Sequence, residues 1–220
     1  MTIFASLSLA EQARQLRNPE GGVGLAVAEW LNDTNRQGNA HAVDLLQLQP
    51  GNCVLEIGFG NGRVAPDVVA RAAGVRYAGI DISPTMVEEA TRFNAALVAA
   101  GRASFHFGSA DGLPFADASF DRAFSTGVTH FWAEPAKPLA EVRRVLRRGG
   151  LSLMTCLHPR SAPAFARPEL GFYLRDDGAW QALHDAVGFS EICAEILEFD
   201  QTSPDGTTVK RHAIRVVARA

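Results

Sequence analysis

An apolar run that ends in a glycine-rich turn most constrains what this chain can fold into. Residues 54–63 read VLEIGFGNGR, and a second apolar run, residues 77–81, ends in Asp81. The first run is typical of a buried parallel strand, and glycines let backbone approach a ligand where a side chain would collide. Asp81 stands where an acid binds ribose hydroxyls in nucleotide-binding α/β folds. The two runs together predict an α/β fold that holds an adenosine-containing cofactor.

The spacing of the glycines favours one kind of cofactor. The dinucleotide fingerprint requires Gly-x-Gly-x-x-Gly, and Gly58 and Gly60 fit its first two positions. The third position is occupied by Arg63, and Gly62 comes one residue early. A carboxylate at Glu56, inside the strand, repels phosphate and attracts an ammonium group. These residues favour a cofactor with an amino-acid tail, such as S-adenosyl-L-methionine, over a dinucleotide.

Three stretches of the chain resemble motifs of the class I S-adenosylmethionine-dependent methyltransferases. The turn over residues 56–62 resembles the family's acid-x-Gly-x-Gly-x-Gly motif. Residues 107–115, FGSADGLPF, and residues 119–121, SFD, are similar to two later motifs of the family. The resemblance is closest to the quinone- and sterol-type small-molecule methyltransferases (the type 11 group), covers residues 51–156 in motif detail, and departs from the pattern at Arg148, where the family usually has proline.

This resemblance implies a set of cofactor-binding residues on the turn and after the later strands. The set is Glu56, Gly58, Gly60, Gly62, Asp81, Ile82, Met86, Ala110, Asp111 and Thr126. Glu56 would help to hold the ammonium, Asp81 would accept both ribose hydroxyls, and Asp111 would accept from the adenine amino group. Met86 fits a place in the hydrophobic core equally well.

His130 is the candidate catalytic residue. It follows the fourth strand, at the strand ends where parallel sheets bind ligands, and could act as a general base. Alternatively it lines the pocket and bonds to backbone. The second role fits the chemistry, because a sulfonium is already an activated methyl donor and alignment alone can supply about 7–11 kcal/mol. Aromatic residues near it, such as Phe131, Phe172 and Trp180, could line an acceptor pocket or pack in the core.

Composition and charge limit the class of partner and the compartment. A net charge of -3 gives no basic footprint for nucleic acid. The N-terminus lacks the pattern of a signal peptide, and no apolar run reaches the roughly 18 residues of a membrane span. Cys53, Cys156 and Cys193 fall in or beside strand-like runs, so we expect buried thiols in a reducing cytoplasm and no metal site. The oligomeric state is not readable.

Strand-like and helical segments alternate along the chain. We expect strands at residues 53–57, 75–80, 103–107, 120–125 and 151–156, with helices at 63–73, 84–100 and 138–147 between them. A helix at 178–187 precedes two strands, 192–199 and 207–217, joined by a turn at 203–206. N-terminal helices are expected at 9–16, 23–32 and 39–48. The predicted fold class is α/β: a Rossmann-like three-layer α/β/α sandwich whose seven-stranded, mostly parallel sheet ends in an antiparallel hairpin.

The predicted organisation is a single domain over residues 1–220. Within it, residues 1–50 form a helical cap, 51–156 the cofactor-binding core, and 157–220 the substrate side with the terminal hairpin. The predicted function is methyl transfer from S-adenosyl-L-methionine to a small-molecule acceptor by in-line displacement, with S-adenosyl-L-homocysteine as product. Two alternatives stay open: an NAD-dependent oxidoreductase, which Glu56 and Arg63 argue against, and a non-catalytic module that binds S-adenosylmethionine.

Overall fold

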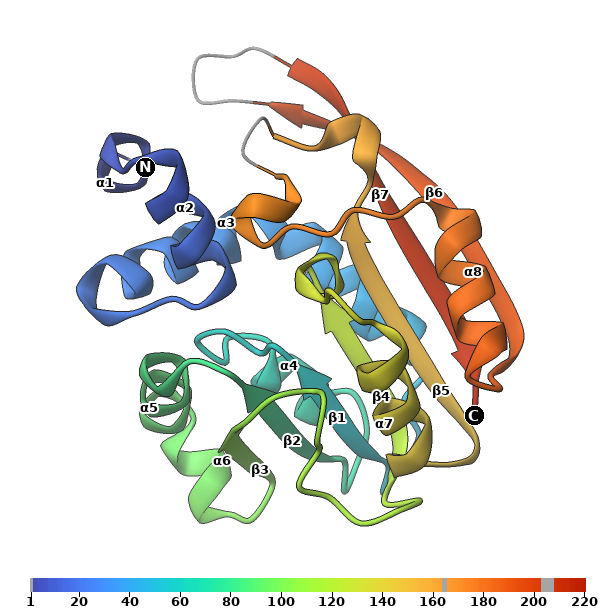
Figure 1. Cartoon of the computed structure of the whole chain (residues 1–220). Helices are drawn as coiled ribbons and strands as arrows, with labels where there is room; N and C mark the ends of the chain where they lie inside the picture. Colours follow the sequence, from blue (N-terminus) through green and yellow to red (C-terminus); the bar gives the residue numbers. More distant parts are fainter. Residues whose placement is uncertain (1, 164–165, 203–207) are drawn as a thin grey trace.

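The alternating apolar runs form one sheet of seven strands within the part of the chain that the structure describes (Figure 1). The computed structural model describes residues 2–163, 166–202 and 208–220. The strands are β1 (Cys53–Ile57), β2 (Arg76–Asp81), β3 (Ala103–Phe107), β4 (Phe120–Thr126), β5 (Leu146–Leu157), β6 (Ser190–Thr202) and β7 (Thr208–Arg219). Their order is β3-β2-β1-β4-β5-β7-β6, and β7 runs antiparallel to both of its neighbours. The expected mostly parallel sheet with a reversed last strand is confirmed.

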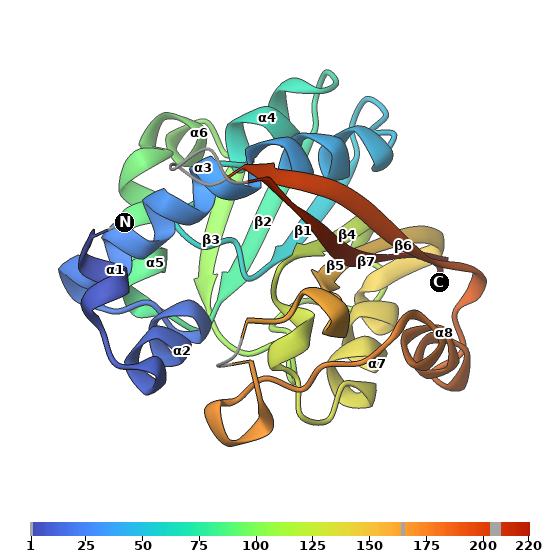
Figure 2. The ribbon, with the colours of Figure 1, turned by 90° about the horizontal axis from the view of Figure 1, so that it is seen from above.

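Helices cover both faces of this sheet (Figure 2). They are α1 (Thr2–Ser6), α2 (Leu9–Arg17), α3 (Gly21–Leu45), α4 (Ala65–Ala70), α5 (Pro84–Phe93), α6 (Ala95–Ala99), α7 (Ala136–Val145) and α8 (Asp177–Ala186), with single 3-10 turns η1 (Thr129–Phe131), η2 (Pro159–Ser161) and η3 (Pro168–Leu170). Buried side chains of α3, α4 and α5 pack on one face, and those of α7 and α8 pack on the other. The three-layer α/β/α arrangement is therefore confirmed.

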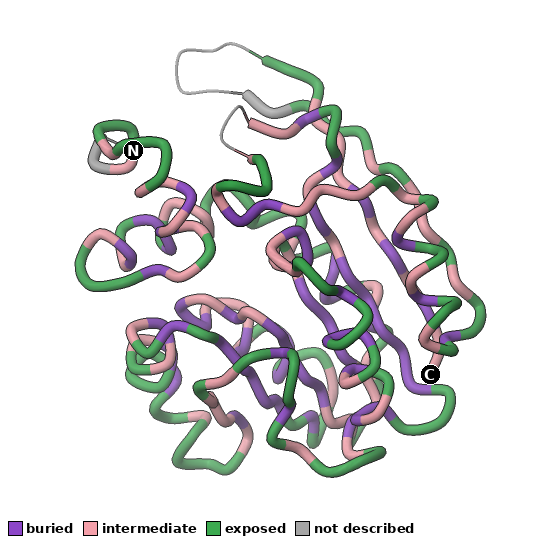
Figure 3. The backbone as a smooth tube through the Cα atoms, in the orientation of Figure 1, coloured by how far each residue is buried: buried purple, intermediate pink, exposed green. Residues whose placement is uncertain are grey.

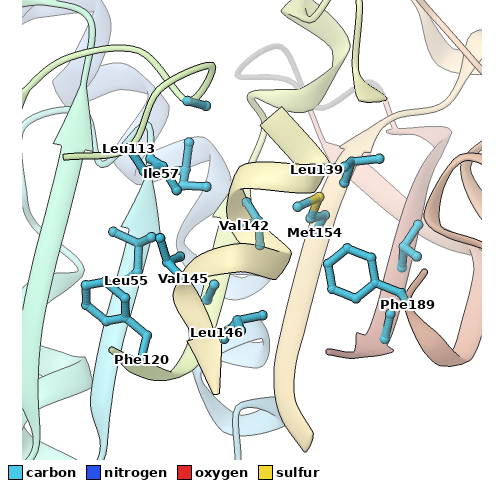
Figure 4. Close-up of a cluster of buried hydrophobic side chains, with 14 of the residues drawn as sticks. Leu55, Ile57, Leu113, Phe120, Leu139, Val142, Val145, Leu146, Met154 and Phe189 are labelled. Atoms are coloured by element: carbon cyan, nitrogen blue, oxygen red, sulfur yellow. The ribbon is translucent and has the colours of Figure 1, made fainter. Parts of the chain in front are cut away.

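The core lies between these layers, and α7 shows how the sequence builds it. Leu139, Val142 and Val145 recur three residues apart, so they face the sheet together and are completely buried. They pack against Leu55 of β1 and Met154 of β5 in the cluster drawn in Figure 4. Each such side chain contributes about 1.5–3 kcal/mol by leaving water. Figure 3 shows the burial concentrated in the central strands, whereas the far end of the hairpin is exposed.

Several element boundaries differ from those predicted. Helix α3 continues as one helix of 25 residues where two were expected, because an exposed polar stretch at residues 33–38 interrupts its apolar stripe without breaking the backbone pattern. The expected helix over 84–100 divides at Asn94, whose side chain donates to the carbonyls of Gly62 and Ala90. Strand β5 begins before Gly149 and passes through both glycines, which were expected to separate the helix from the strand.

The C-terminal hairpin is longer than predicted, and it contacts α3. The predicted turn at 203–206, with Thr207, lies outside the described residues. On β7 the Arg215 guanidinium bonds Glu195 of β6 and His41 of α3, at 2.8 Å and 2.6 Å. These bonds fix the hairpin against the long helix.

The expectation of three buried cysteines is wrong for Cys193. Cys156 of β5 is buried and Cys53 is half-buried, but Cys193 is exposed. The physical reason is its strand: β6 is an edge strand, and a bulge between Ser190 and Cys193 shifts its register.

Two kinds of feature, a membrane-spanning helix and a metal-binding cluster, are absent from the described residues. No helix in the ranges 2–163, 166–202 and 208–220 combines the length and apolar character needed to cross a bilayer. Over the same ranges, no three histidine, cysteine or carboxylate side chains come together in a way that could hold a metal ion.

His184 of α8 makes a testable contribution to stability. Its Nδ1 lies 2.7 Å from the Trp180 carbonyl, and its Nε2 is buried with no partner in the described part of the chain. Burial therefore holds the pKa of His184 below 6.5, its ordinary value. As the pH falls below 6.5, His184 binds a proton in the unfolded chain and not in the folded chain. Its contribution to the free energy of unfolding is therefore complete above pH 6.5 and is lost as the pH falls.

We expect His184→Asn, which keeps a donor near the Trp180 carbonyl and does not titrate, to flatten the fall in unfolding free energy between about pH 7.5 and 5. Urea titrations at several pH values measure this slope. Gln181→Asn, at an exposed position of the same helix, is the matched control and should keep the wild-type slope. Equal slopes for His184→Asn and the wild type would contradict the prediction.

Candidate functional site

The carboxyl ends of three neighbouring strands bring the predicted site residues to one edge of the sheet. Ile57 of β1 pairs with Ile80 of β2, and the Gly58 amide donates to the Ile80 carbonyl at 2.8 Å. Glu56 pairs with Phe124 of β4, which places Thr126 level with Gly58. The strand order reverses between β1 and β4, and such a switch point is where open α/β sheets bind ligands.

The three glycines of the turn serve different purposes. All have positive φ: 73° at Gly58, 59° at Gly60 and 74° at Gly62. A Cβ atom added at Gly58 would lie 2.3 Å from Cγ2 of Val128, and one at Gly62 would lie 2.6 Å from Cβ of Ala90. At Gly60 an added Cβ atom meets nothing within 4 Å. Gly58 and Gly62 therefore allow close packing, whereas Gly60 faces open space that a ligand can enter.

Asp81 is fixed at the end of β2 by backbone donors. The Gly60 amide donates to its Oδ2 and the Ser83 amide to its Oδ1, each at 2.9 Å. The Gly108 amide, after β3, donates to the Asp81 backbone carbonyl at 3.0 Å. Burial raises the pKa of the Asp81 carboxyl group to about 6, and the backbone donors limit that rise. Asp81 is therefore mostly ionised at pH 7 and joins the turns that follow three strands.

Glu56 lies beneath the turn and is nearly sealed from solvent, with 2 % of its surface exposed. The Tyr77 hydroxyl donates to its Oε2 at 2.7 Å. Burial raises the pKa of Glu56 to about 8, and the charge of Asp81 adds to the rise. The side chain expected to be a carboxylate is thus mostly protonated at neutral pH.

The segments after β2 and β3 present apolar side chains beside polar groups. Ile82 is 41 % exposed and Phe107 is 64 % exposed, and both flank the Asp81 turn. Asp111 is exposed, and its Oδ2 accepts from the Ser109 hydroxyl at 3.3 Å, whereas Ala110 is buried. This edge therefore offers exposed apolar surface and an accessible carboxylate for a flat, polar-edged ligand.

Met86 does not join these exposed groups. Its side chain is completely buried on α5, in the same hydrophobic cluster as Phe59 and Ala90. The core position that the sequence also allowed for it is where the structure places it. A contact between Met86 and a cofactor stays a prediction.

His130 lies in η1, after β4, and is buried. Its ring stacks on Phe172 with centroids 5.5 Å apart and planes 11° apart, and its Nδ1 accepts from the Leu157 amide at 3.5 Å. Because Nδ1 accepts, we infer that the ring proton is on Nε2. Burial lowers the pKa of His130 to about 4, so the imidazole is neutral at pH 7.

The other aromatic side chains divide between the site and the core. Phe131 contacts both His130 and Phe172, with centroids 4.3 Å and 4.8 Å away. Trp180 is buried in the main hydrophobic cluster. The aromatic group beside the site therefore consists of His130, Phe131 and Phe172.

Helix α3 is bonded directly to the glycine turn. Glu29 accepts from the Asn61 side-chain amide at 3.1 Å and from the Arg63 guanidinium. Asn32 donates to Oδ1 of Asn61 at 3.0 Å. The segment before α3 is held as well, because the Pro19 carbonyl accepts from the Ser83 hydroxyl. The N-terminal helices are thus joined to two of the turns that surround Gly60.

Sequence patterns did not single out Tyr77, Asn61 or Glu29 as members of this site. A signal exists for Tyr77, since it pairs with Val54 and so shares a sheet face with Glu56. No comparable signal exists for Glu29, which reaches the turn only because α3 crosses it. Its position depends on tertiary packing.

Comparison with known proteins identifies the type of domain. Residues 55–154 match the family model described as methyltransferase domain. The chain is similar to an O-methyltransferase, resE, of Aspergillus sclerotiorum, with 36% identity over 47% of this chain and 39% of that protein. It is also similar to the ubiquinone/menaquinone biosynthesis C-methyltransferase UbiE of Paracoccus denitrificans, with 38% identity over 49% of this chain and 43% of that protein. The chain thus spans about two fifths of the length of these curated relatives.

Solved structures of methyltransferases share the fold. Phosphoethanolamine N-methyltransferase 2 of Haemonchus contortus, in complex with S-adenosyl-L-methionine, has a TM-score of 0.75 and 17% identity over 97% of this chain and 60% of that chain. A SAM-dependent methyltransferase from Aquifex aeolicus has a TM-score of 0.64 and 17% identity over 88% of this chain and 96% of that chain. At these identities the likeness shows the fold.

The two kinds of glycine in the turn can be distinguished by stability. We expect Gly60→Ala to cost about 1–2 kcal/mol, from the left-handed backbone alone. Gly62→Ala has the same backbone cost and also forces Cβ against Ala90, so about 1–3 kcal/mol more is expected. Urea unfolding of both variants measures the difference. Equal losses would show that Gly62 does not serve close packing.

Proposed function

We propose that this chain, a member of the class I S-adenosylmethionine-dependent methyltransferase family, transfers the methyl group of S-adenosyl-L-methionine to a small-molecule acceptor by in-line displacement. The observation that carries the proposal is the Asp81 carboxylate, held beside the open Gly60 backbone at the switch point of the sheet. The described residues fit each part of that cofactor. Gly60 leaves room for its tail, Asp81 offers two acceptor oxygens to the ribose, and Ile82 and Phe107 offer apolar surface to the adenine.

The proposed binding roles follow from these positions. Glu56 lies under the turn, where it can hold the ammonium of the tail, and Asp111 can accept from the adenine amino group. Thr126 and the backbone of Ala110 and Gly58 border the same edge of the sheet. A pyrophosphate fits less well, because Arg63, the cation of the turn, already pairs with Glu29 and Glu89.

The chain contributes mainly alignment to the proposed reaction. The bound cofactor would supply a methyl group already activated on a sulfonium. The turn is fixed by the contacts of Gly58 and Gly62, so the residues that bind the tail are in place before the cofactor arrives. An acceptor held in line with the methyl group would bond to the methyl carbon as the carbon–sulfur bond breaks, the electron pair of that bond going to sulfur. S-adenosyl-L-homocysteine would leave as a neutral thioether, and the acceptor proton would pass to water.

His130 is proposed to hold the acceptor side as a neutral group. With a pKa of about 4 the imidazole is a weak base at pH 7, and its Nε2 carries a proton that can be donated to an acceptor oxygen. Phe131 and Phe172 enclose the ring. Aromatic side chains of this kind suit a small molecule better than a polymer, and the net charge of -3 gives nucleic acid no attraction. Residues 1–50 and 157–220 are proposed to cover the acceptor side, with residues 51–156 as the cofactor-binding core.

Asp81 provides the direct test of the cofactor. We expect Asp81→Ala to lower the affinity for S-adenosyl-L-homocysteine by about 100-fold or more, because two bonds to a charged group are worth about 1.5–3 kcal/mol each. Calorimetry measures the affinity, and circular dichroism checks that the fold is kept. Asp81→Asn preserves the shape and one acceptor, so it should lose less. Unchanged affinity in Asp81→Ala would remove the ribose assignment. Binding of NADH without binding of S-adenosyl-L-homocysteine would favour the oxidoreductase alternative.

His130 provides the test of the chemistry. We expect His130→Gln to retain turnover within about tenfold of the wild type. At saturating cofactor, the wild-type turnover number should be flat in pH from about 5.5 to 8, since the pKa of His130 is about 4. The measurement is S-adenosyl-L-homocysteine formation over a panel of hydroxyl, amine and carbon acceptors. A loss of about 10²–10⁴-fold would instead assign His130 as a general base. Cofactor binding with no turnover on any acceptor would favour a non-catalytic module.

A further inference from the structure

Tyr77 stands out as a buried polar group to which the proposed reaction gives no role. It is 3 % exposed, its ring lies on the α4 and α5 side of the sheet, and Phe105 packs against it with centroids 5.6 Å apart. Its hydroxyl donates to Oε2 of Glu56 at 2.7 Å. If Tyr77 only filled the core, phenylalanine would cost less free energy there, because it has no hydroxyl group that needs a buried partner.

A missing side chain on β2 makes this bond possible. Tyr77 and Gly79 lie on the same face of the strand, and Gly79 pairs with Glu56 of β1. A Cβ atom added at Gly79 would lie 2.9 Å from the Tyr77 oxygen and 2.5 Å from Cδ1 of Phe59. The Tyr77 ring therefore reaches along its own strand, over Gly79, to the Glu56 carboxyl group. Gly79 therefore leaves room for the Tyr77 hydroxyl as well as for the Phe59 ring.

We propose that Tyr77 is a positioning residue of the cofactor site: its hydroxyl fixes the Glu56 carboxyl group beneath the glycine turn, and the cofactor ammonium that binds there drives a proton from Glu56 into solvent. The inference rests on the proposed function, since it requires a cofactor with an ammonium tail. It adds Tyr77 to the residues of the site and predicts that cofactor binding releases a proton.

The charges around Glu56 support a release of this kind. Tyr77 and Asp81, both on β2, are the titratable groups that act on it, and burial favours its neutral form. Among the charged side chains of the turn, α4 and α5, Asp67, Glu88 and Arg92 are exposed, whereas Glu89 is mostly buried and pairs with Arg63 and Arg92. The Arg63 guanidinium also pairs with Glu29, and its Nη1 is buried with no partner among the described residues. An ammonium placed beside Glu56 would add a positive charge next to it, and an adjacent cation favours the carboxylate. The Tyr77 hydroxyl, as a donor, favours the carboxylate as well.

The sign of the pH dependence follows by linkage. A group whose pKa falls on binding releases a proton, so the affinity rises with pH until the group is already ionised in the free protein. Once the titration of the ligand's own amine is divided out, the affinity should rise by up to about tenfold per pH unit and level off near pH 8, where Glu56 is ionised in the free protein. Asp81 titrates near pH 6, so measurements between about pH 6.5 and 9 separate the two groups.

The experiment is calorimetry with S-adenosyl-L-homocysteine, which keeps the ammonium and cannot react. Titrations at pH 7 in buffers of different ionisation enthalpy count the protons released. Since the ligand's own amine titrates in the same range, the difference between the wild type and Glu56→Gln is the quantity that matters. We expect the wild type to release about one proton more than Glu56→Gln.

Tyr77→Phe tests the positioning role. Without the hydroxyl, the Glu56 carboxylate loses a donor, so the affinity at pH 7 should fall about tenfold and the levelling point should move above pH 8. Phe105→Leu is the matched control, because it loosens the packing around Tyr77 and keeps the hydroxyl. It should lower the melting temperature and leave the levelling point unchanged. A merely structural role for Tyr77 predicts the same behaviour in both variants.

The outcomes are distinct. If the wild type does not bind S-adenosyl-L-homocysteine, the proposed function fails and this inference fails with it. If the wild type binds with the same proton count as Glu56→Gln, or if Tyr77→Phe keeps the wild-type pH profile, this inference alone is overturned. Should Tyr77→Phe fail to fold, the comparison of the wild type with Glu56→Gln still decides whether the proton is released.

Discussion

The carboxylate of Asp81 is the constraint on which the site depends. Its two oxygens accept from backbone amides of the turn after β1 and of the turn that opens α5, and its own carbonyl accepts from the backbone after β3. A buried carboxylate is costly unless it is hydrogen-bonded, so these amides are held to it as firmly as it is held to them. Three separate turns thereby share one fixed point at the carboxyl edge of the sheet.

That fixed point works only because the turn around it is closely packed. Val128 fills the space over Gly58, and Ala90 fills the space over Gly62, so the turn has little freedom on either side. Gly60 is left facing the open space between them. A backbone that is already in its binding conformation loses little entropy when a ligand arrives, and such preorganisation serves both affinity and alignment. The spacing of the three glycines therefore produces both the rigid turn and the open space at Gly60.

The sequence predicted the parts of this arrangement that are encoded locally. Strands β1 and β3 have the predicted bounds, because short apolar runs between turn residues leave few alternatives. Asp81 at the end of β2 and the antiparallel terminal hairpin were predictable for the same reason. Features that need a distant partner were not: α3 continues past its polar stretch, Cys193 is exposed by a bulge, and Glu56 is protonated because burial and the charge of Asp81 raise its pKa. Burial of an ionisable group is set by tertiary packing, and a single sequence does not contain it in readable form.

The long helix α3 has a mechanical consequence. Glu29, near its beginning, bonds the glycine turn, and His41, near its end, bonds Arg215 of the terminal hairpin. The two contacts lie roughly 18 Å apart along a helix axis, at about 1.5 Å per residue. A continuous helix transmits a tilt of one end to the other with little loss, whereas two shorter helices joined by a loop would absorb it. One continuous helix therefore connects the terminal hairpin to the glycine turn at the centre of the sheet, so a movement of the hairpin would also tilt the turn.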